Sequence, residues 1–202
     1  RAHCADDHAR KRRDHRRRRS AVLMGPFEVK AALEQMTVLV DTREQSTPSF
    51  RKRMDAIGAP YIRRKLDFGD YSAACTLEDG TELDLSGSVA IERKMDLDEL
   101  CGCFCRSRDR FEREFIRAKN ADAKLYLLIE NGTWEKAYAG KSRSRMQPKA
   151  FVASLTAWLA RYNCQIIFCE PATTGKLIRE VLYRELKERL EVMECPQAIT
   201  DS

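Results

Sequence analysis

Two acidic residues and a lysine, Asp70, Glu92 and Lys94, have the types and spacing of a site that hydrolyses phosphodiester bonds. Strand side chains alternate between faces, so Glu92 and Lys94 project to one side and Arg93 to the other. Two carboxylates can share a hard divalent cation, which acidifies bound water. Lys94 then holds the attacking water or stabilises the charge that builds on the phosphate. The same spacing is also common on exposed, salt-bridged strands, so it is not specific alone.

The elements around these residues must bring Asp70 and Glu92 together. A β-branched run predicts a strand over residues 37–41, and Pro48 opens an expected helix that Gly58 ends. Further strands are expected over 61–66, 71–76, 81–85 and 89–94, with turn signals at 78–80 and 86–88. In this meander Asp70 begins one strand and can lie beside Glu92.

The second half of the chain changes to a helical period. Asp96 with Glu99 has the form of a helix start, and an interrupted helical segment is expected to reach about residue 119. The remaining elements are expected as a buried strand at 124–130, a basic loop at 131–149, a helical stripe over 151–162, a strand at 165–169 and a final helix over 178–190. Strands that alternate with helices imply parallel pairing. The predicted class is α/β, with a three-layer core and a mixed central sheet flanked by helices.

Charge is distributed unevenly along the 202 residues. Residues 1–20 hold nine Lys and Arg and three Asp and Glu, which accounts for the whole net charge of +6. Residues 1–35 are therefore expected to be a basic, disordered leader, residues 36–192 the folded domain and residues 193–202 a tail. The leader, with its run from Arg16 to Arg19, either adds phosphate affinity or is a solvated segment without function.

Composition narrows the remaining classes. No segment approaches the roughly 20 apolar residues that span a bilayer, so no membrane partner is expected. The eight cysteines are expected to be reduced and mostly buried. Cys101, Cys103 and Cys105 form the one cluster, and zinc binding by these three remains an alternative without a nearby histidine.

Three segments closely resemble the nuclease domain of the XPF family, which consists of structure-specific endonucleases of the PD-(D/E)XK superfamily. The family signature is Gly-Asp, a variable gap, Glu-Arg-Lys, three residues and Asp. The matching segments are VDTRE at 40–44, GDY at 69–71 and IERK at 91–94, followed by Asp98. Arg110–Phe111 and YLLIE at 126–130 match further positions, and the resemblance covers roughly residues 37–190.

The resemblance implies a restriction-endonuclease-like fold and a role for each matched residue. It makes Asp70 and Glu92 ligands of Mg²⁺ or Mn²⁺, with Lys94 catalytic. Asp41 is expected as a further ligand, directly or through water, and Asp98 either as a water-mediated ligand or as a charge that favours the helix dipole. Arg93 is assigned with the catalytic residues, in a structural or phosphate-orienting role. The residues expected to contact DNA are Arg43, Arg110, Lys141, Arg143, Arg145 and Lys149.

The sequence departs from the family pattern in two respects. The gap between Asp70 and Glu92 is long because residues 78–88 intervene, and Asp79, Glu82 and Asp84 are substitute ligands if Asp70 is misaligned. The helix-hairpin-helix module that many members carry after this domain is not expected here. The basic residues of the 136–149 loop and of the leader are then the expected means of holding phosphates without reading sequence.

The expected activity is cleavage of branched, flap or duplex DNA in repair, recombination or phage DNA processing. A non-catalytic DNA-binding or scaffold partner is the alternative, although such partners usually lack some motif residues. A homodimer or heterodimer through the nuclease domain is implied, and the stripe of Phe151, Leu155, Trp158 and Leu159 is either its surface or core. The expected location is the cytoplasm, as for a nucleoid-associated bacterial or phage-type protein, or the nucleus in a eukaryote.

Overall fold

The structure is a computed structural model that describes residues 23–144 and 146–194. Residues 1–22 of the expected leader, Arg145 and the tail from residue 195 onward lie outside the described residues. The rest of the expected leader is not disordered: Pro26–Glu34 form a helix whose Val29, Ala32 and Leu33 are buried in the core, so the predicted boundary at residue 35 was wrong. In the part that is described, no helix is long and apolar enough to cross a membrane.

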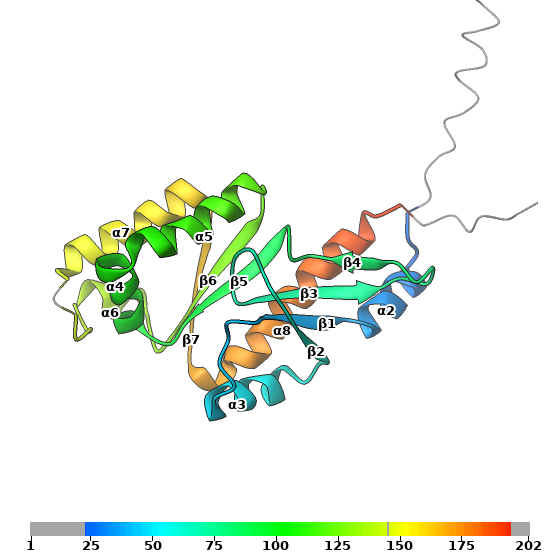
Figure 1. The fold of residues 1–202 in the computed structure, drawn as a ribbon, viewed down its shortest axis with the longest axis horizontal. Coiled ribbons are helices and arrows are strands. Elements are labelled where there is room, and N and C mark those ends of the chain that lie inside the picture. Colours follow the sequence, from blue (N-terminus) through cyan, green and yellow to red (C-terminus); the bar gives the residue numbers. More distant parts are fainter. Residues whose placement is uncertain (1–22, 145, 195–202) are drawn as a thin grey trace, which may run out of the picture.

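A mixed sheet of seven strands forms the centre of the fold, as expected (Figure 1). Its strands are β1 (Thr37–Asp41), β2 (Tyr61–Arg64), β3 (Tyr71–Thr76), β4 (Glu82–Asp84), β5 (Val89–Lys94), β6 (Lys124–Glu130) and β7 (Gln165–Cys169). The order is β2-β1-β3-β5-β6-β7, and β4 pairs with β3. Strand β5 is antiparallel to β3 and parallel to β6, so the sheet changes from antiparallel to parallel pairing at β5.

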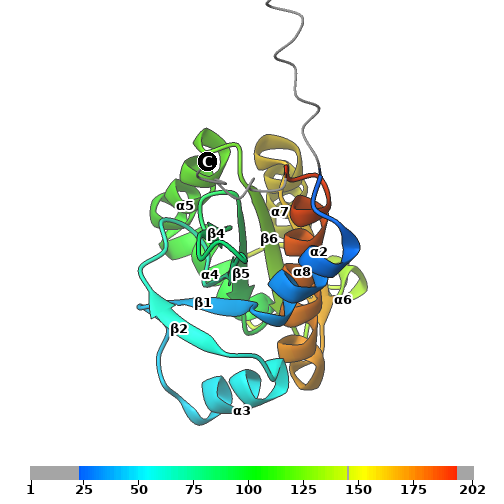
Figure 2. The same cartoon turned by 90° about the vertical axis from the view of Figure 1, so that its right-hand side faces the viewer.

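Helices cover both faces of the sheet (Figures 1 and 2). They are α2 (Pro26–Glu34), α3 (Pro48–Ile57), α4 (Leu97–Arg106), α5 (Arg108–Asn120), α6 (Trp134–Tyr138), α7 (Pro148–Tyr162) and α8 (Pro171–Glu191). Asp96 caps α4 by accepting a hydrogen bond from the backbone N–H of Glu99, and Ser107 separates α4 from α5. The predicted interruption of this helical segment is thus confirmed.

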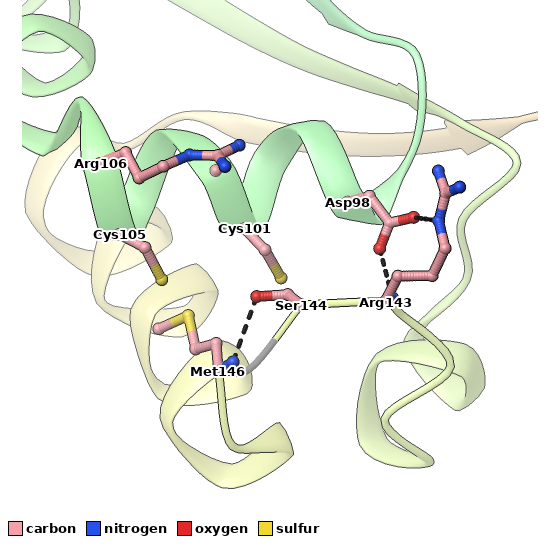
Figure 3. A pocket seen from close by; sticks show the side chains of 8 residues that line it. Asp98, Cys101, Cys105, Arg106, Arg143, Ser144 and Met146 are labelled. Atoms are coloured by element: carbon pink, nitrogen blue, oxygen red, sulfur yellow. Dashed lines mark hydrogen bonds and ion pairs between the residues drawn. The ribbon is translucent and has the colours of Figure 1, made fainter.

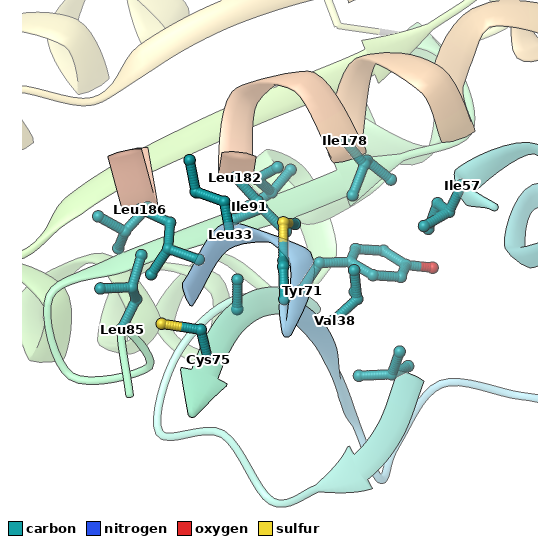
Figure 4. Close-up of a cluster of buried hydrophobic side chains, with 14 of the residues drawn as sticks. Leu33, Val38, Ile57, Tyr71, Cys75, Leu85, Ile91, Ile178, Leu182 and Leu186 are labelled. Atoms are coloured by element: carbon teal, nitrogen blue, oxygen red, sulfur yellow. The ribbon is translucent and has the colours of Figure 1, made fainter. Parts of the chain in front are cut away.

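Each face of the sheet has its own apolar core. One core lies under α2, α3 and α8 and includes Tyr71, Ile91 and Leu182 (Figure 4). Gly175 of α8 allows close approach to α3, because a Cβ there would lie 2.5 Å from the carbonyl oxygen of Arg53. The other core lies under α4, α5 and α7 and contains a cluster of aromatic rings around the fully buried Trp158.

The structure decides three open expectations about the helices. Residues 131–149 were expected as a loop but include the short helix α6, which Thr133 caps. The stripe on α7 belongs to the core, since Phe151, Leu155 and Trp158 are buried, and it therefore offers no free dimer surface. The final helix also packs into the core and begins earlier than expected, at Pro171.

Candidate active site

Asp70 lies beside Glu92 because the start of β3 is joined to β5 by backbone hydrogen bonds. The N–H of Asp70 donates to the carbonyl oxygen of Ile91 at 2.8 Å. In return the N–H of Arg93 donates to Oδ2 of Asp70 at 2.8 Å. The Asp70 carboxylate is therefore fixed next to the segment that carries Glu92.

Gly69 is required for this junction. Its φ of +72° lies in the left-handed region, which a residue with a Cβ rarely adopts. A Cβ at this position would lie 2.7 Å from Cβ of Ala90 and 3.2 Å from the carbonyl oxygen of Ile91. The glycine before Asp70 thus lets the two strands approach and points the aspartate toward the site.

Glu92 and Lys94 share one side of β5, as their spacing predicts. Nζ of Lys94 donates to Oε1 of Glu92 at 2.5 Å, and both residues are buried. The Lys94 ammonium also lies 5.2 Å from the ring centroid of Phe111, which places it over an electron-rich aromatic face. Oε2 of Glu92 is buried and has no hydrogen-bond partner among the described residues.

These side chains line a cavity of about 290 Å³. The lining residues are Arg43, Glu44, Asp70, Glu92, Lys94, Glu99, Cys103, Ser107, Arg110, Phe111 and Glu114. Five carboxylates face three cationic side chains in this group. The cavity, called the acidic pocket below, therefore has an excess of negative charge.

The electrostatics of the acidic pocket follow from burial and from crowding of like charges. Burial raises the pKa of Asp70 to about 6, although Lys94 opposes the change. Burial and the neighbouring Asp70 also raise the pKa of Glu92 well above its ordinary value. Burial alone would lower the pKa of Lys94, but Glu92 and Asp70 reverse the effect and raise it. Lys94 is therefore a cation at neutral pH.

A hard divalent cation fits this set of residues. The carboxylates of Asp70 and Glu92 supply the oxygen ligands that Mg²⁺ and Mn²⁺ prefer, and the unpartnered Oε2 of Glu92 needs a positive neighbour. In residues 23–144 and 146–194, no three His, Cys, Asp or Glu side chains are grouped closely enough to form a complete metal centre. Waters and substrate oxygens would therefore supply most of the coordination, as is usual for Mg²⁺.

Asp41 ends β1 as expected, but its carboxylate is already occupied by protein donors. Oδ1 accepts from the backbone N–H of Arg43 at 2.7 Å and from its Nε at 2.6 Å. Oδ2 accepts from the backbone N–H of Leu66 at 2.8 Å. Asp41 does not line the acidic pocket. Its observed contacts hold loops together rather than leave oxygens for a metal.

Asp98 lies on a different face of α4 from the acidic pocket. Its carboxylate accepts from the backbone N–H of Arg143 at 2.5 Å and from its Nε at 2.8 Å (Figure 3). These residues line a separate hollow of about 630 Å³ with Cys101, Gly102, Cys105, Arg106, Ser144 and Met146. In this arrangement Asp98 holds Arg143 and does not line the acidic pocket.

Arg93 points away from Lys94, as the alternation of the strand predicts. Its Nε and Nη2 donate to the two carboxylate oxygens of Glu130 on β6, at 2.8 and 2.6 Å. Arg93 is absent from the lining of the acidic pocket, so the geometry gives it a structural rather than a directly catalytic position.

The residues expected to bind DNA fall into two groups. Arg43 and Arg110 line the acidic pocket beside Asp70 and Glu92. Lys141, Arg143 and Lys149 are exposed and lie on the segment around α6 and the start of α7. Arg145 lies outside the described residues. The second group therefore contributes to a surface outside the acidic pocket.

The three acids considered as substitute metal ligands, at positions 79, 82 and 84, lie outside the acidic pocket. Glu82 and Asp84 both pair with Arg64 at 2.6 Å, and Asp79 accepts from Thr81 within its own turn. The placement of Asp70 beside Glu92 thus supports the alignment on Asp70.

The cysteines were expected to be mostly buried, but only half of those described are. Of the six described, Cys75, Cys101 and Cys164 are buried, Cys103 and Cys169 are half-buried and Cys105 is exposed. All six are free thiols, and within the described segments none belongs to a metal-binding group. The zinc alternative therefore has no support in this geometry.

Two acids of the pocket were not assigned to the site from the sequence: Glu99 and Glu114. Glu44, in the matched VDTRE segment, also lines the pocket, and its Oε2 accepts from Tyr71 at 2.8 Å and from Arg53 at 3.1 Å. Glu99 was assigned only to the helix start. Glu114 lies four residues after Arg110 on α5, and this helical spacing is the signal that would have placed it on the same face.

This chain is similar to known proteins in sequence and in fold. The ERCC4 domain matches residues 40–181 by sequence. XPF from Aeropyrum pernix is similar in structure, at 22% identity and a TM-score of 0.52, over 82% of this chain and 66% of that chain. The same protein in complex with DNA gives 22% identity and a TM-score of 0.53, over 78% and 69%. No curated protein sequence matches significantly.

The structural likeness confirms the predicted fold, and the chain spans about two thirds of the length of the solved structures it matches. The sequence match extends from the end of β1 to α8 and includes every residue of the Asp70, Glu92 and Lys94 constellation. The match covers well over half of the chain, and the chain therefore belongs to the ERCC4-domain family.

Proposed function

We propose that this protein is a DNA endonuclease that depends on Mg²⁺ or Mn²⁺ and uses Asp70, Glu92 and Lys94. The observation that carries the proposal is the pair of carboxylates beside one lysine, with Glu92 buried, Asp70 half-buried and no hydrogen-bond partner for Oε2 of Glu92 among the described residues. Membership of the ERCC4-domain family supports a nuclease, and the related XPF structure in complex with DNA supports DNA as the substrate.

Asp70 and Glu92 would hold the cation, which supplies an acidified water and withdraws charge from the phosphate. Glu92 and Asp70 raise the pKa of Lys94, so its side chain is an ammonium at neutral pH when no cation is bound. An ammonium at this position is suited to donating hydrogen bonds to phosphate oxygens as their charge grows. Phe111 and Glu92 hold Lys94 in place for this task.

Arg43 and Arg110 add positive charge at the mouth of the same pocket. Guanidinium groups bind phosphates through paired N–H donors, so these two residues would position the DNA backbone without reading bases. Branched or flap DNA is the proposed substrate class, in keeping with the family that the sequence resembles.

The test is cleavage of labelled DNAs: a 3′ flap, a fork, a four-way junction, a single strand and a plain duplex. Each is incubated with Mg²⁺, Mn²⁺ or EDTA, using the wild type and Lys94→Ala. We expect metal-dependent cutting near a branch, slowed at least about 100-fold in Lys94→Ala. Binding without cutting in either metal would instead identify a DNA-binding scaffold.

A further inference from the structure

Helix α5 connects the loops that carry the site residues. Nε of Arg117 donates to the carbonyl oxygen of Asp67 at 2.5 Å, in the segment that leads into Asp70. Nη1 of Arg43 donates to Oε1 of Glu114 at 2.9 Å, in the segment that follows β1. One face of α5 is therefore tied to both loops at the edge of the acidic pocket.

Glu114 is the unexpected member of this arrangement. Only 9% of Glu114 is exposed. A carboxylate buried to this degree needs a compensating positive charge. Arg43 supplies that charge at 2.9 Å, with Arg117 at 3.8 Å. Glu114 also lines the pocket proposed to bind DNA, where its negative charge alone would repel phosphate. A favourable role in DNA binding must therefore be indirect.

Glu114 can affect DNA binding indirectly through Arg43, to which it is hydrogen-bonded. The backbone N–H and Nε of Arg43 donate to Asp41, and its Nη1 donates to Glu114. Within residues 23–144 and 146–194, the hydrogen bonds of its guanidinium use only Nε and Nη1, and 46% of the side chain is exposed. A guanidinium held at two corners keeps Nη2 available for a phosphate oxygen, with its orientation already fixed.

We propose that Glu114 is a positioning residue that holds Arg43 as a clamp for a DNA phosphate beside the cleaved bond. This inference rests on the proposed DNA-binding function. With only the hydrogen bond from Nε to Asp41, the guanidinium could still rotate about that bond. The second hydrogen bond, from Nη1 to Glu114, fixes the plane of the group. The fixed plane lowers the entropy that Arg43 loses when it binds phosphate.

The test compares two substitutions at Glu114 that differ in what they remove. Glu114→Gln keeps an acceptor for Arg43 but removes the charge, whereas Glu114→Ala removes both. Glu112→Ala is the matched control, because Glu112 lies on the same helix and pairs with Arg161, outside the pocket. Affinity for a fluorescein-labelled 3′-flap duplex is measured in EDTA, and single-turnover cleavage in Mg²⁺. Arg43→Ala and the Arg43→Ala/Glu114→Ala double variant complete a cycle.

We expect Glu114→Ala to weaken DNA binding about fivefold, and Glu114→Gln and Glu112→Ala to stay within about twofold of wild type. In the Arg43→Ala background, Glu114→Ala should weaken binding no further. Tighter binding by both Glu114 variants would show simple charge repulsion and overturn the proposal. Additive losses in the double variant would overturn it as well, because Glu114 would then not act through Arg43.

The failure of each proposal has a separate signature. If the wild type binds the flap but does not cleave it, the nuclease proposal fails while the binding cycle still decides the role of Glu114. If the wild type cleaves and the cycle shows no coupling between Arg43 and Glu114, only the clamp is overturned. If the wild type binds no DNA, both are overturned.

Discussion

At the scale of single residues, the site is defined by charges that burial makes unfavourable without a cation. Asp70 and Glu92 lie side by side at the β3–β5 junction, and Lys94 is joined to Glu92 at 2.5 Å. Burial is the main cause that raises the pKa of both carboxylates, the neighbouring Asp70 adds to the effect at Glu92, and Lys94 only partly offsets it. This environment disfavours the ionised carboxylates in the fold and suits the divalent ion proposed above.

Asp70→Asn is therefore expected to stabilise the metal-free protein. In the wild type, the folded state disfavours the Asp70 carboxylate, whose pKa of about 6 lies above its ordinary value. The resulting loss of stability is absent below about pH 4, grows as the pH rises to about 6 and is complete above it. In EDTA at pH 7.5 the variant should melt a few degrees higher than the wild type, with no difference near pH 4.

Saturating Mn²⁺ should remove this advantage, because the metal stabilises only the protein that binds it. Thermal melts with and without Mn²⁺ measure both effects. A lower melting temperature for Asp70→Asn in EDTA at pH 7.5 would show that the folded state does not disfavour the Asp70 carboxylate.

The residues of the site were predictable only where they follow from local geometry. Alternation along β5 placed Glu92 with Lys94 and turned Arg93 away, and the structure confirms this. Glu114 reaches the pocket from α5 through tertiary packing, and its spacing of four residues from Arg110 was the one local signal that pointed to this face. Asp98 follows Lys94 by four residues, yet the path of α4 carries it to another hollow.

At the scale of elements, α4 separates two recesses. Glu99 and Cys103 face the acidic pocket, whereas Asp98, Cys101 and Cys105 face the neighbouring hollow (Figure 3). Helical spacing of three and four residues explains both sets. Strand positions were predicted within a few residues because period-two and buried runs are strong signals, while the five-residue helix α6 was too short to show a period.

The contact between β6 and α8 leads to a prediction at this scale. Burial alone would raise the pKa of Glu185 on α8, but hydrogen bonds from Lys124, Tyr126 and Arg189 lower it instead. Glu185→Gln should therefore reduce the free energy of unfolding by about 2 kcal/mol at pH 7.

The sign of the pH dependence follows from the lowered pKa. The stabilisation by Glu185 is complete above the ordinary glutamate pKa near 4.5 and is lost as the pH falls through the lower folded-state value. Urea unfolding of the wild type and of Glu185→Gln at pH 7 and pH 3 should show the difference shrinking at pH 3. A constant difference would mean that packing, not charge, is what the substitution removes.

At the scale of the whole molecule, the sheet changes from antiparallel to parallel pairing at β5, and the acidic pocket lies there. Two separate cores fix β5 from both faces, so the site is supported by most of the folded body. The net positive charge, in contrast, comes from residues 1–20. The candidate active site and the net positive charge therefore lie in different parts of the chain.

Removal of residues 1–22 is expected to weaken DNA binding without changing the cleavage rate constant at saturating DNA. The segment up to residue 20 contains nine Lys and Arg, so its loss should make the plot of log affinity against log salt shallower by roughly 2–5. Binding titrations at several salt concentrations measure this slope. An unchanged slope would mean that this basic segment makes no phosphate contacts.

The most direct test of the active site is single-turnover cleavage of a 3′-flap DNA in Mg²⁺ by the wild type, Asp70→Asn and Asp67→Asn. Asp67 is exposed and lies three residues before Asp70, outside the lining of the acidic pocket. Asp70→Asn should slow cleavage by at least about 1,000-fold, because one of the two carboxylates proposed to hold the metal is lost, while Asp67→Asn should stay within about twofold. Cleavage by Asp70→Asn at the wild-type rate would contradict the assignment of the site.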